Sequence, residues 1–181
     1  MNALLAAAFF STPLAMQTDT DWFTVDDNEL FTFELPSYME KTTDLNDEAA
    51  CEYQYVDSPY QKGGREIYML VMFETKEEIE EYELDFTFDA KNYWELAVES
   101  LTEPLKAVKI LSPELRIENF NEMNLTRSFV FAKFGKIKVY YNLAVYEGEH
   151  AFYQVLAWTV NEHFEYYKPD MERIIESFQE K

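Results

Sequence analysis

Glycine is scarce in this sequence, with 4 in 181 residues. A P-loop or a dinucleotide-binding fingerprint needs several glycines at fixed spacing, and no stretch of the chain supplies them. Cysteine occurs once, as Cys51, and histidine twice, as His150 and His163. A cysteine-rich zinc site and an intramolecular disulfide are therefore excluded. The sequence accordingly predicts no bound cofactor and no metal.

Positive charge is also in short supply. The chain has 15 Lys and Arg against 35 Asp and Glu, a net charge of -20. Nucleic acids and anionic membranes both attract basic surfaces and repel acidic ones. We therefore expect no nucleic-acid binding, and at most a peripheral contact with a membrane.

Hydrophobic residues, by contrast, make up 48% of the chain and aromatic residues 17%. A chain with this content can bury enough surface to offset the conformational entropy lost on folding. Its length suits one compact domain, because typical domains contain about 100 to 200 residues. We expect a single folded domain.

The N-terminus predicts export. Residues 3 to 10 form an apolar run, and small residues follow as far as Ala15. The run is shorter than the roughly 20 residues that cross a bilayer, and it is typical of a signal-peptide core. We predict a signal peptide over residues 1–16, one domain over residues 17–181, and a periplasmic or secreted location.

Most of the remaining sequence alternates with a period of two, which is typical of strands. A hairpin is expected over residues 22–25 and 30–35, and a meander over residues 126–134, 137–146 and 151–160. The run from Ile67 to Phe73 is apolar on both faces. Such a strand lies inside a sheet that is covered on both sides.

Three segments have a helical period instead. Residues 77–83 predict a short, exposed and very acidic helix. Ala90, Trp94, Ala97, Val98 and Leu101 predict a longer one, with Thr87 or Asp89 as its N-cap. A third helix is expected around residues 171–178, with Pro169 in its first turn. The whole pattern predicts the α+β class, an antiparallel β-sheet with helices packed on its faces.

Two short segments carry a resemblance to a known family. Residues 33–39 read FELPSYM after the first hairpin, and residues 167–169 and 174–178 read YKP and IIESF after a last strand that contains Trp158. These segments resemble the PsbP-like family, which includes an extrinsic subunit of the oxygen-evolving complex and small exported bacterial proteins. The resemblance implies an α/β/α sandwich and an accessory or binding role. It supplies no catalytic residues.

A basic spot is the strongest candidate for a binding site. Residues 19–85 contain 20 acidic and 4 basic residues, net -16, whereas residues 86–181 contain 15 and 11, net -4. No acidic residue lies between Glu122 and Glu147. The basic residues of that interval are Arg127, Lys133, Lys136 and Lys138. On two paired strands they predict a site for an anionic ligand or for an acidic patch of a partner.

The other reactive residues favour structural roles. Glu147, Glu149 and His150 surround Gly148, and a tight turn with a left-handed glycine explains this cluster better than a metal site does. His163 is expected to be exposed at the start of a helix. Cys51 is expected to be buried and to have no redox or catalytic role. A reactive thiol needs basic neighbours that lower its pKa, and the charged residues nearest to Cys51 in the sequence are Glu48 and Glu52.

The sequence therefore favours an exported accessory or binding protein without catalytic activity. We expect a monomer that binds a protein or a small anionic ligand. The alternative is an enzyme of the hydrolase type that uses His150 or His163 together with a distant carboxylate.

Overall fold

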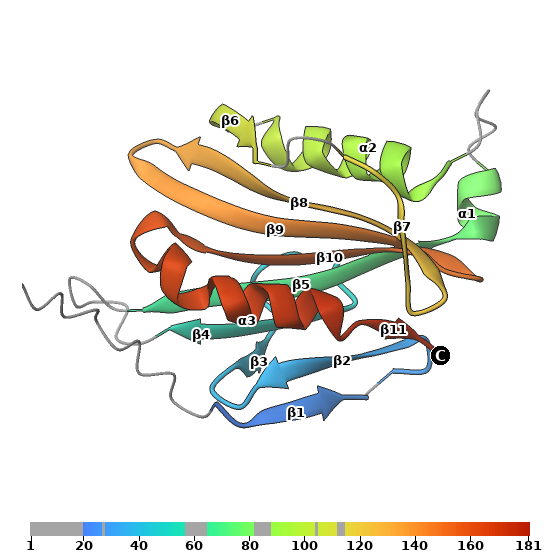
Figure 1. Ribbon diagram of the computed structural model, residues 1–181, viewed down its shortest axis with the longest axis horizontal. Helices are drawn as coiled ribbons and strands as arrows, with labels where there is room; N and C mark the ends of the chain where they lie inside the picture. Colours follow the sequence, from blue (N-terminus) through green and yellow to red (C-terminus); the bar gives the residue numbers. More distant parts are fainter. Residues whose placement is uncertain (1–19, 27, 57–64, 82–87, 104, 112–114) are drawn as a thin grey trace, which may run out of the picture.

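The computed structural model describes residues 20–26, 28–56, 65–81, 88–103, 105–111 and 115–181 (Figure 1). The predicted signal peptide over residues 1–16 lies outside these ranges. Among the described residues, none of the helices is long and apolar enough to cross a membrane.

An eight-stranded antiparallel sheet, the main sheet, forms the centre of the molecule. Its strands follow the order β3-β4-β5-β10-β9-β8-β6, and β7 pairs with β8. The predicted strand inside the sheet is β5, which has neighbours on both sides. The strands are β3 (Glu40–Thr42), β4 (Cys51–Val56), β5 (Glu66–Thr75), β6 (Lys106–Ile110), β7 (Glu118–Phe120), β8 (Met123–Phe134), β9 (Ile137–Glu147) and β10 (Ala151–Val160).

One face of the main sheet is covered by α3 (Phe164–Glu176) and by a second, three-stranded sheet. We call this side of the main sheet the α3 face. The second sheet has the order β1-β2-β11, with β1 (Trp22–Val25), β2 (Phe31–Pro36) and β11 (Gln179–Glu180). A one-turn 3₁₀ helix, η1 (Asn161–His163), leads from β10 into α3. Cys51 is buried on this face, as predicted.

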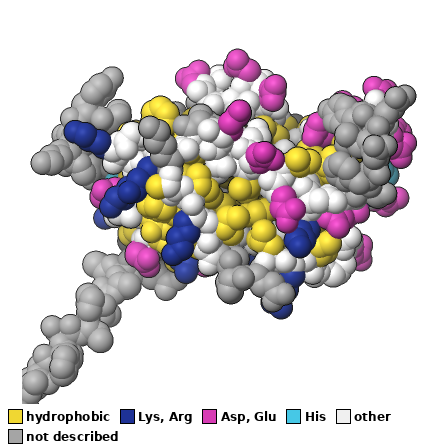
Figure 2. Space-filling model, turned by 90° about the horizontal axis from the view of Figure 1, so that it is seen from above, with side chains coloured by type: hydrophobic (Ala, Val, Ile, Leu, Met, Phe, Trp, Pro, Cys, Tyr) yellow, Lys and Arg dark blue, Asp and Glu magenta, His cyan; other side chains and the backbone are white. Residues whose placement is uncertain are grey.

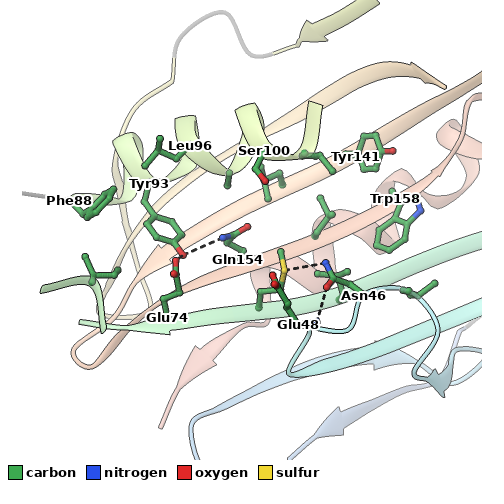
Figure 3. Close-up of a pocket in the computed structure, with 18 residues that line it drawn as sticks. Asn46, Glu48, Glu74, Phe88, Tyr93, Leu96, Ser100, Tyr141, Gln154 and Trp158 are labelled. Atoms are coloured by element: carbon green, nitrogen blue, oxygen red, sulfur yellow. Dashed lines mark hydrogen bonds between the residues drawn. The ribbon is translucent and has the colours of Figure 1, made fainter. Parts of the chain in front are cut away.

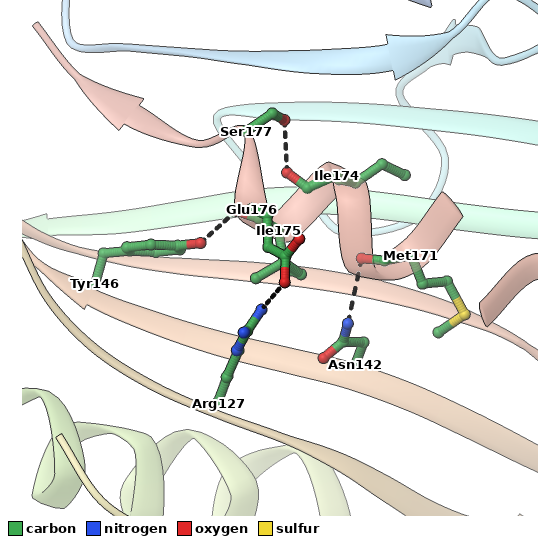
Figure 4. Close-up of polar contacts among 8 residues, drawn as sticks. All are labelled: Arg127, Asn142, Tyr146, Met171, Ile174, Ile175, Glu176 and Ser177. Atoms are coloured by element: carbon green, nitrogen blue, oxygen red, sulfur yellow. Dashed lines mark hydrogen bonds and ion pairs between the residues drawn. The ribbon is translucent and has the colours of Figure 1, made fainter. Parts of the chain in front are cut away.

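Polar contacts fix α3 on β9 (Figure 4). The Asn142 side chain donates to the carbonyl of Met171 at 3.2 Å, and the Tyr146 hydroxyl donates to the carbonyl of Ile175. Both side chains are buried. The Ile175 carbonyl also accepts from the backbone N–H of Phe178 at 3.2 Å, so the Tyr146 hydroxyl adds a second bond at the C-terminal end of α3.

The opposite face, which we call the α2 face, is covered by α2 (Ala90–Thr102), with the short α1 (Lys76–Glu80) at one end. The N-cap of α2 is Asp89, whose side chain accepts from the backbone of Lys91 and Asn92. The predicted apolar stripe of this helix lies on the sheet, where Ala90, Trp94, Ala97 and Val98 are buried. The α+β sandwich expected from the sequence is therefore confirmed.

Two details differ from the prediction. Pro169 lies inside α3 and not in its first turn, because the helix already begins at Phe164 and buries Phe164 and Tyr167. Gly148 does not have a left-handed φ, whereas Gly135 does. What Gly148 provides is space, since a Cβ there would collide with the carboxylate of Glu180.

Candidate functional site

A pocket of about 660 Å³ opens between α2 and the main sheet. It exists because α2 packs on β8, β9 and β10, whereas the neighbouring β5 is contacted by α1 at one end. The connection between β3 and β4 forms the facing wall. Ligand sites in proteins are typically concave spaces of about 300 to 1,000 Å³ with mostly apolar walls. The pocket is therefore the candidate functional site (Figure 3).

The floor of the pocket is a row of leucines across three neighbouring strands. Leu70 of β5 pairs in register with Leu156 of β10, which pairs with Leu143 of β9. Successive residues of a strand point to opposite faces, so one register brings all three to the α2 face. Trp94 holds the helix above them, since its ring nitrogen donates to the carbonyl of Leu143 at 2.9 Å.

A polar cluster interrupts this apolar surface at the α1 end. The hydroxyl of Tyr93 on α2 donates to the carboxylate of Glu74 on β5, and it accepts from the Gln154 side chain at 3.2 Å. Figure 3 shows the three side chains converging from the helix and from two strands. The cluster offers a ligand one carboxylate and one amide next to an apolar floor.

An aromatic cluster lies at the other end. Trp158 of β10 and Tyr141 of β9 line the pocket, with ring centroids 6.3 Å apart. Tyr68 stacks on Trp158 at 5.3 Å, with 16° between the ring planes. Burial and the adjacent Glu66 carboxylate raise the pKa of Tyr68 to about 12, so this hydroxyl stays protonated at neutral pH.

The wall opposite α2 depends on a buried carboxylate. Glu52 of β4 accepts from the backbone N–H groups of Leu45, at 3.0 Å, and of Asn46. The Asn46 side chain in turn reaches the sulfur of Met72 at 3.6 Å. A carboxylate that accepts two backbone N–H bonds holds a loop firmly, so Glu52 positions this wall.

The charged side chains that line the pocket are acidic. Glu48 and Glu74 are charged, whereas lysine, arginine and histidine are absent from the described lining residues. An anionic ligand would be repelled here, while a neutral or cationic group would be accepted.

The residues of the predicted basic spot lie away from this pocket. Arg127 forms an ion pair with Glu176 of α3 at 2.9 Å, so its charge is used within the fold (Figure 4). Lys133 and Lys138 pair with each other across β8 and β9, and Lys136 lies in the turn between these strands. The structure therefore brings three of the four predicted residues together.

The two histidines lie at opposite ends of β10, and neither lines the pocket. His150 is exposed in the turn before the strand. His163 is half-buried, contrary to the prediction, because it follows β10 directly and packs edge-on against Tyr167. Within the described ranges, no group of three or more His, Cys, Asp or Glu side chains is arranged to hold a metal.

Comparison with known proteins supports the fold. No family model and no curated protein sequence matches the chain. Among solved structures, cyanobacterial PsbP from Synechocystis sp. PCC 6803 matches with a TM-score of 0.57 and 7% identity, over 98% of this chain and 99% of that one. The chain has a PsbP-like fold.

Two further structures share this architecture. LpqN of Mycobacterium tuberculosis, described as involved in cell envelope biogenesis, has a TM-score of 0.56 and 10% identity, over 90% of this chain and 92% of that one. PA94 of Pseudomonas aeruginosa, described as a putative regulator of unknown function, has 0.52 and 11%, over 87% and 94%. At these identities the likeness concerns the fold alone.

The pocket residues were not among the site residues predicted from the sequence. Leu70, Leu143 and Leu156 were recognisable as inward-facing strand residues, but nothing in the sequence shows that α2 stops short of β5. Glu52 alternates with the inward residues Cys51 and Tyr53, so the pattern placed it on the opposite face and gave no signal that this acid is buried.

Proposed function

We propose that this protein is a non-catalytic ligand-binding protein that works as a monomer outside the cytoplasm. Its pocket binds a small molecule with a largely apolar body and a neutral or cationic polar group. The observation that carries the proposal is a pocket of about 660 Å³ with a leucine floor, aromatic side chains and two carboxylates. The apolar body would lie on the leucine row, and the polar group would meet Glu74 and Gln154.

An accessory role is supported by the comparisons only at a coarse level. Two of the structures compared above are described as an envelope-biogenesis protein and a putative regulator, and neither description names a reaction. The enzyme alternative gains no support from the pocket, because neither histidine lies in it. An extracytoplasmic location rests on the apolar N-terminal run.

The test uses two fluorescent probes that differ by one charge. N-phenyl-1-naphthylamine is neutral and apolar, and 1-anilinonaphthalene-8-sulfonate is its sulfonated form. The neutral probe should bind to the full chain more tightly than the sulfonate, because Glu48 and Glu74 repel the anion. Tighter binding of the sulfonate would contradict the proposed ligand class.

A pair of variants on α2 locates the binding. Ser100 lines the pocket, whereas its neighbour Glu99 is exposed and does not. Ser100→Phe should lower the affinity for the neutral probe by about tenfold, since the new ring occupies apolar volume. Glu99→Phe should change it by less than about twofold. Equal effects would place the probe outside the pocket.

A further inference from the structure

The free end of the β8–β9 hairpin combines exposed apolar side chains with lysines. Phe134 and Ile137 pair with each other next to the turn, and they are 63% and 53% exposed. No other large apolar side chain among the described residues is as exposed. Lys133 and Lys138 form the next pair, and Lys136 lies in the turn. We call residues 133–138 the hairpin tip.

The turn itself is adapted to a free end. Gly135 has φ +61°, and a Cβ at this position would meet nothing within 4 Å. A left-handed glycine at the first position is what a tight two-residue hairpin turn requires. The glycine therefore serves the backbone, and the space around the tip is open.

The lysines of the hairpin tip do not stabilise the fold. Like charges directly opposite each other on neighbouring strands destabilise a sheet, and Lys133 faces Lys138 in this way. In the part of the chain that the structure describes, Lys133, Lys136 and Lys138 form no ion pair. An anionic surface outside the molecule would relieve this repulsion.

The net charge of the protein does not prevent such a contact. The tip and the acidic α1 lie at opposite ends of the main sheet (Figure 1). The 11 residues of β9 between these ends span roughly 35 Å, several times the Debye length of about 8 Å in physiological salt. Glu162 of η1 and Glu165 of α3 lie nearer, and within the described residues they form no ion pair with the lysines of the tip.

The exposed apolar pair decides which anionic surface fits. A free anion or an acidic polypeptide would engage the lysines and leave Phe134 and Ile137 in water. A lipid bilayer provides phosphates for the lysines and an apolar layer beneath them. Figure 2 shows hydrophobic side chains across the middle of one face, with lysine and arginine side chains mainly at its left and acidic ones along its upper edge and right.

We propose that the hairpin tip docks the protein on an anionic lipid bilayer. Phe134 and Ile137 insert at the level of the headgroups, and Lys133, Lys136 and Lys138 contact lipid phosphates. This contact is separate from the pocket and does not depend on the proposed ligand.

The experiment measures sedimentation of the full chain with vesicles of phosphatidylglycerol and phosphatidylcholine, or of phosphatidylcholine alone. Binding should require phosphatidylglycerol and weaken as salt increases. Each lysine near such a surface strengthens binding about fivefold, so Lys133→Gln with Lys138→Gln should lower the affinity about 25-fold. The matched control, Lys76→Gln with Lys91→Gln on α1 and α2, removes the same charge and should change it by less than about twofold.

A second pair of measurements tests insertion. Phe134→Ser with Ile137→Ser should lower the affinity about tenfold, because two half-exposed apolar side chains no longer leave water. In a Phe134→Trp variant, the emission of the new indole should shift to the blue when phosphatidylglycerol vesicles are added. Phe134 and Ile137 are exposed, so their substitution should leave the fold intact. The melting temperature of each variant checks this.

Several results would overturn the proposal. They are an absence of binding to phosphatidylglycerol vesicles at low salt, an equal loss in the Lys76 and Lys91 control, or no emission shift at position 134. If polyglutamate bound through Lys133 and Lys138 while vesicles did not, the tip would be a site for an acidic protein instead.

Discussion

On the α3 face of the main sheet, a helix and a second sheet bury large aromatic side chains such as Phe31, Tyr153 and Phe178. On the α2 face, a single helix covers part of the same strands and leaves about 660 Å³ open. Both covers are joined to β9, through Asn142 and Tyr146 on one face and through Trp94 on the other. The difference therefore lies in how much of the sheet each cover reaches.

This comparison separates stability from binding. A close-packed face contributes most of the free energy of folding, because burial of apolar surface is the dominant favourable contribution. A half-covered face gives up part of that contribution and gains a concave surface. We infer that the α3 face carries the stability of the fold and that the α2 face carries the candidate site.

The first prediction compares the loss of stability when one large side chain on each face is truncated. Phe178 is fully buried against Phe31, Tyr146 and Tyr153, and Phe178→Ala should lower the free energy of unfolding by about 3 to 5 kcal/mol. Leu156→Ala should cost about 2 kcal/mol, at the low end for leucine, because this side chain already borders open space. Urea denaturation measures both, and equal costs would contradict the assignment.

The second prediction concerns the wall of the pocket. In Glu52→Gln, one acceptor oxygen becomes an NH₂ group and loses a backbone bond to Leu45 or Asn46. Because Glu52 is buried, the free energy of unfolding should fall by about 1.5 to 3 kcal/mol. The affinity for the neutral probe should fall as well, since the loop forms part of the pocket. Glu48→Gln, in the same loop, is the control and should leave stability nearly unchanged. Unaltered probe binding in Glu52→Gln would show that the loop does not shape the site.

Sequence patterns predicted most strands of the main sheet, because the alternation of residues within one strand shows which of them share a face. In β9, Leu143 and Val145 belong to the core of one face and Ala144 and Tyr146 to the core of the other, in agreement with the predicted period of two. The α2 stripe and its Asp89 cap were also recognisable, because a helix start and an apolar period are local properties.

The pocket was not predictable, because it depends on how elements distant in sequence lie beside each other. Tyr93 and Gln154 are 61 positions apart, and their bond exists only because α2 crosses β10 at that point. The ion pair of Arg127 was not predictable for the same reason. Its partner Glu176 is 49 positions away, in a helix that lies on the far side of the sheet from α2.

The third prediction compares one hydroxyl on each face. Tyr146→Phe removes a bond between two buried groups, so the free energy of unfolding should fall by about 1 to 2 kcal/mol. Tyr93→Phe should cost about 0.5 kcal/mol, because Glu74 and Gln154 remain half-exposed and regain water. The melting temperatures of the two variants rank the faces. A larger loss for Tyr93→Phe would indicate that the α2 face is the better packed one.

The fourth prediction concerns the C-terminal end of the α3 cover, where Glu180 of β11 accepts from the backbone of Glu149 and His150 and from the Tyr153 hydroxyl. Burial alone would raise the pKa of this carboxyl, but these donors hold it below its usual range. A lowered pKa means that the ionised form stabilises the fold above about pH 4.3, and that this contribution is lost as the pH falls through the folded-state pKa. Glu180→Gln should therefore lower the free energy of unfolding by about 1 kcal/mol at pH 7, a small loss because the side chain is partly exposed. The loss should be smaller at pH 3, because the carboxyl is then closer to protonation. Unfolding of both proteins in urea at the two pH values measures the difference. A difference that does not shrink toward pH 3 would show that the charge of Glu180 does not hold the second sheet on the β9–β10 turn.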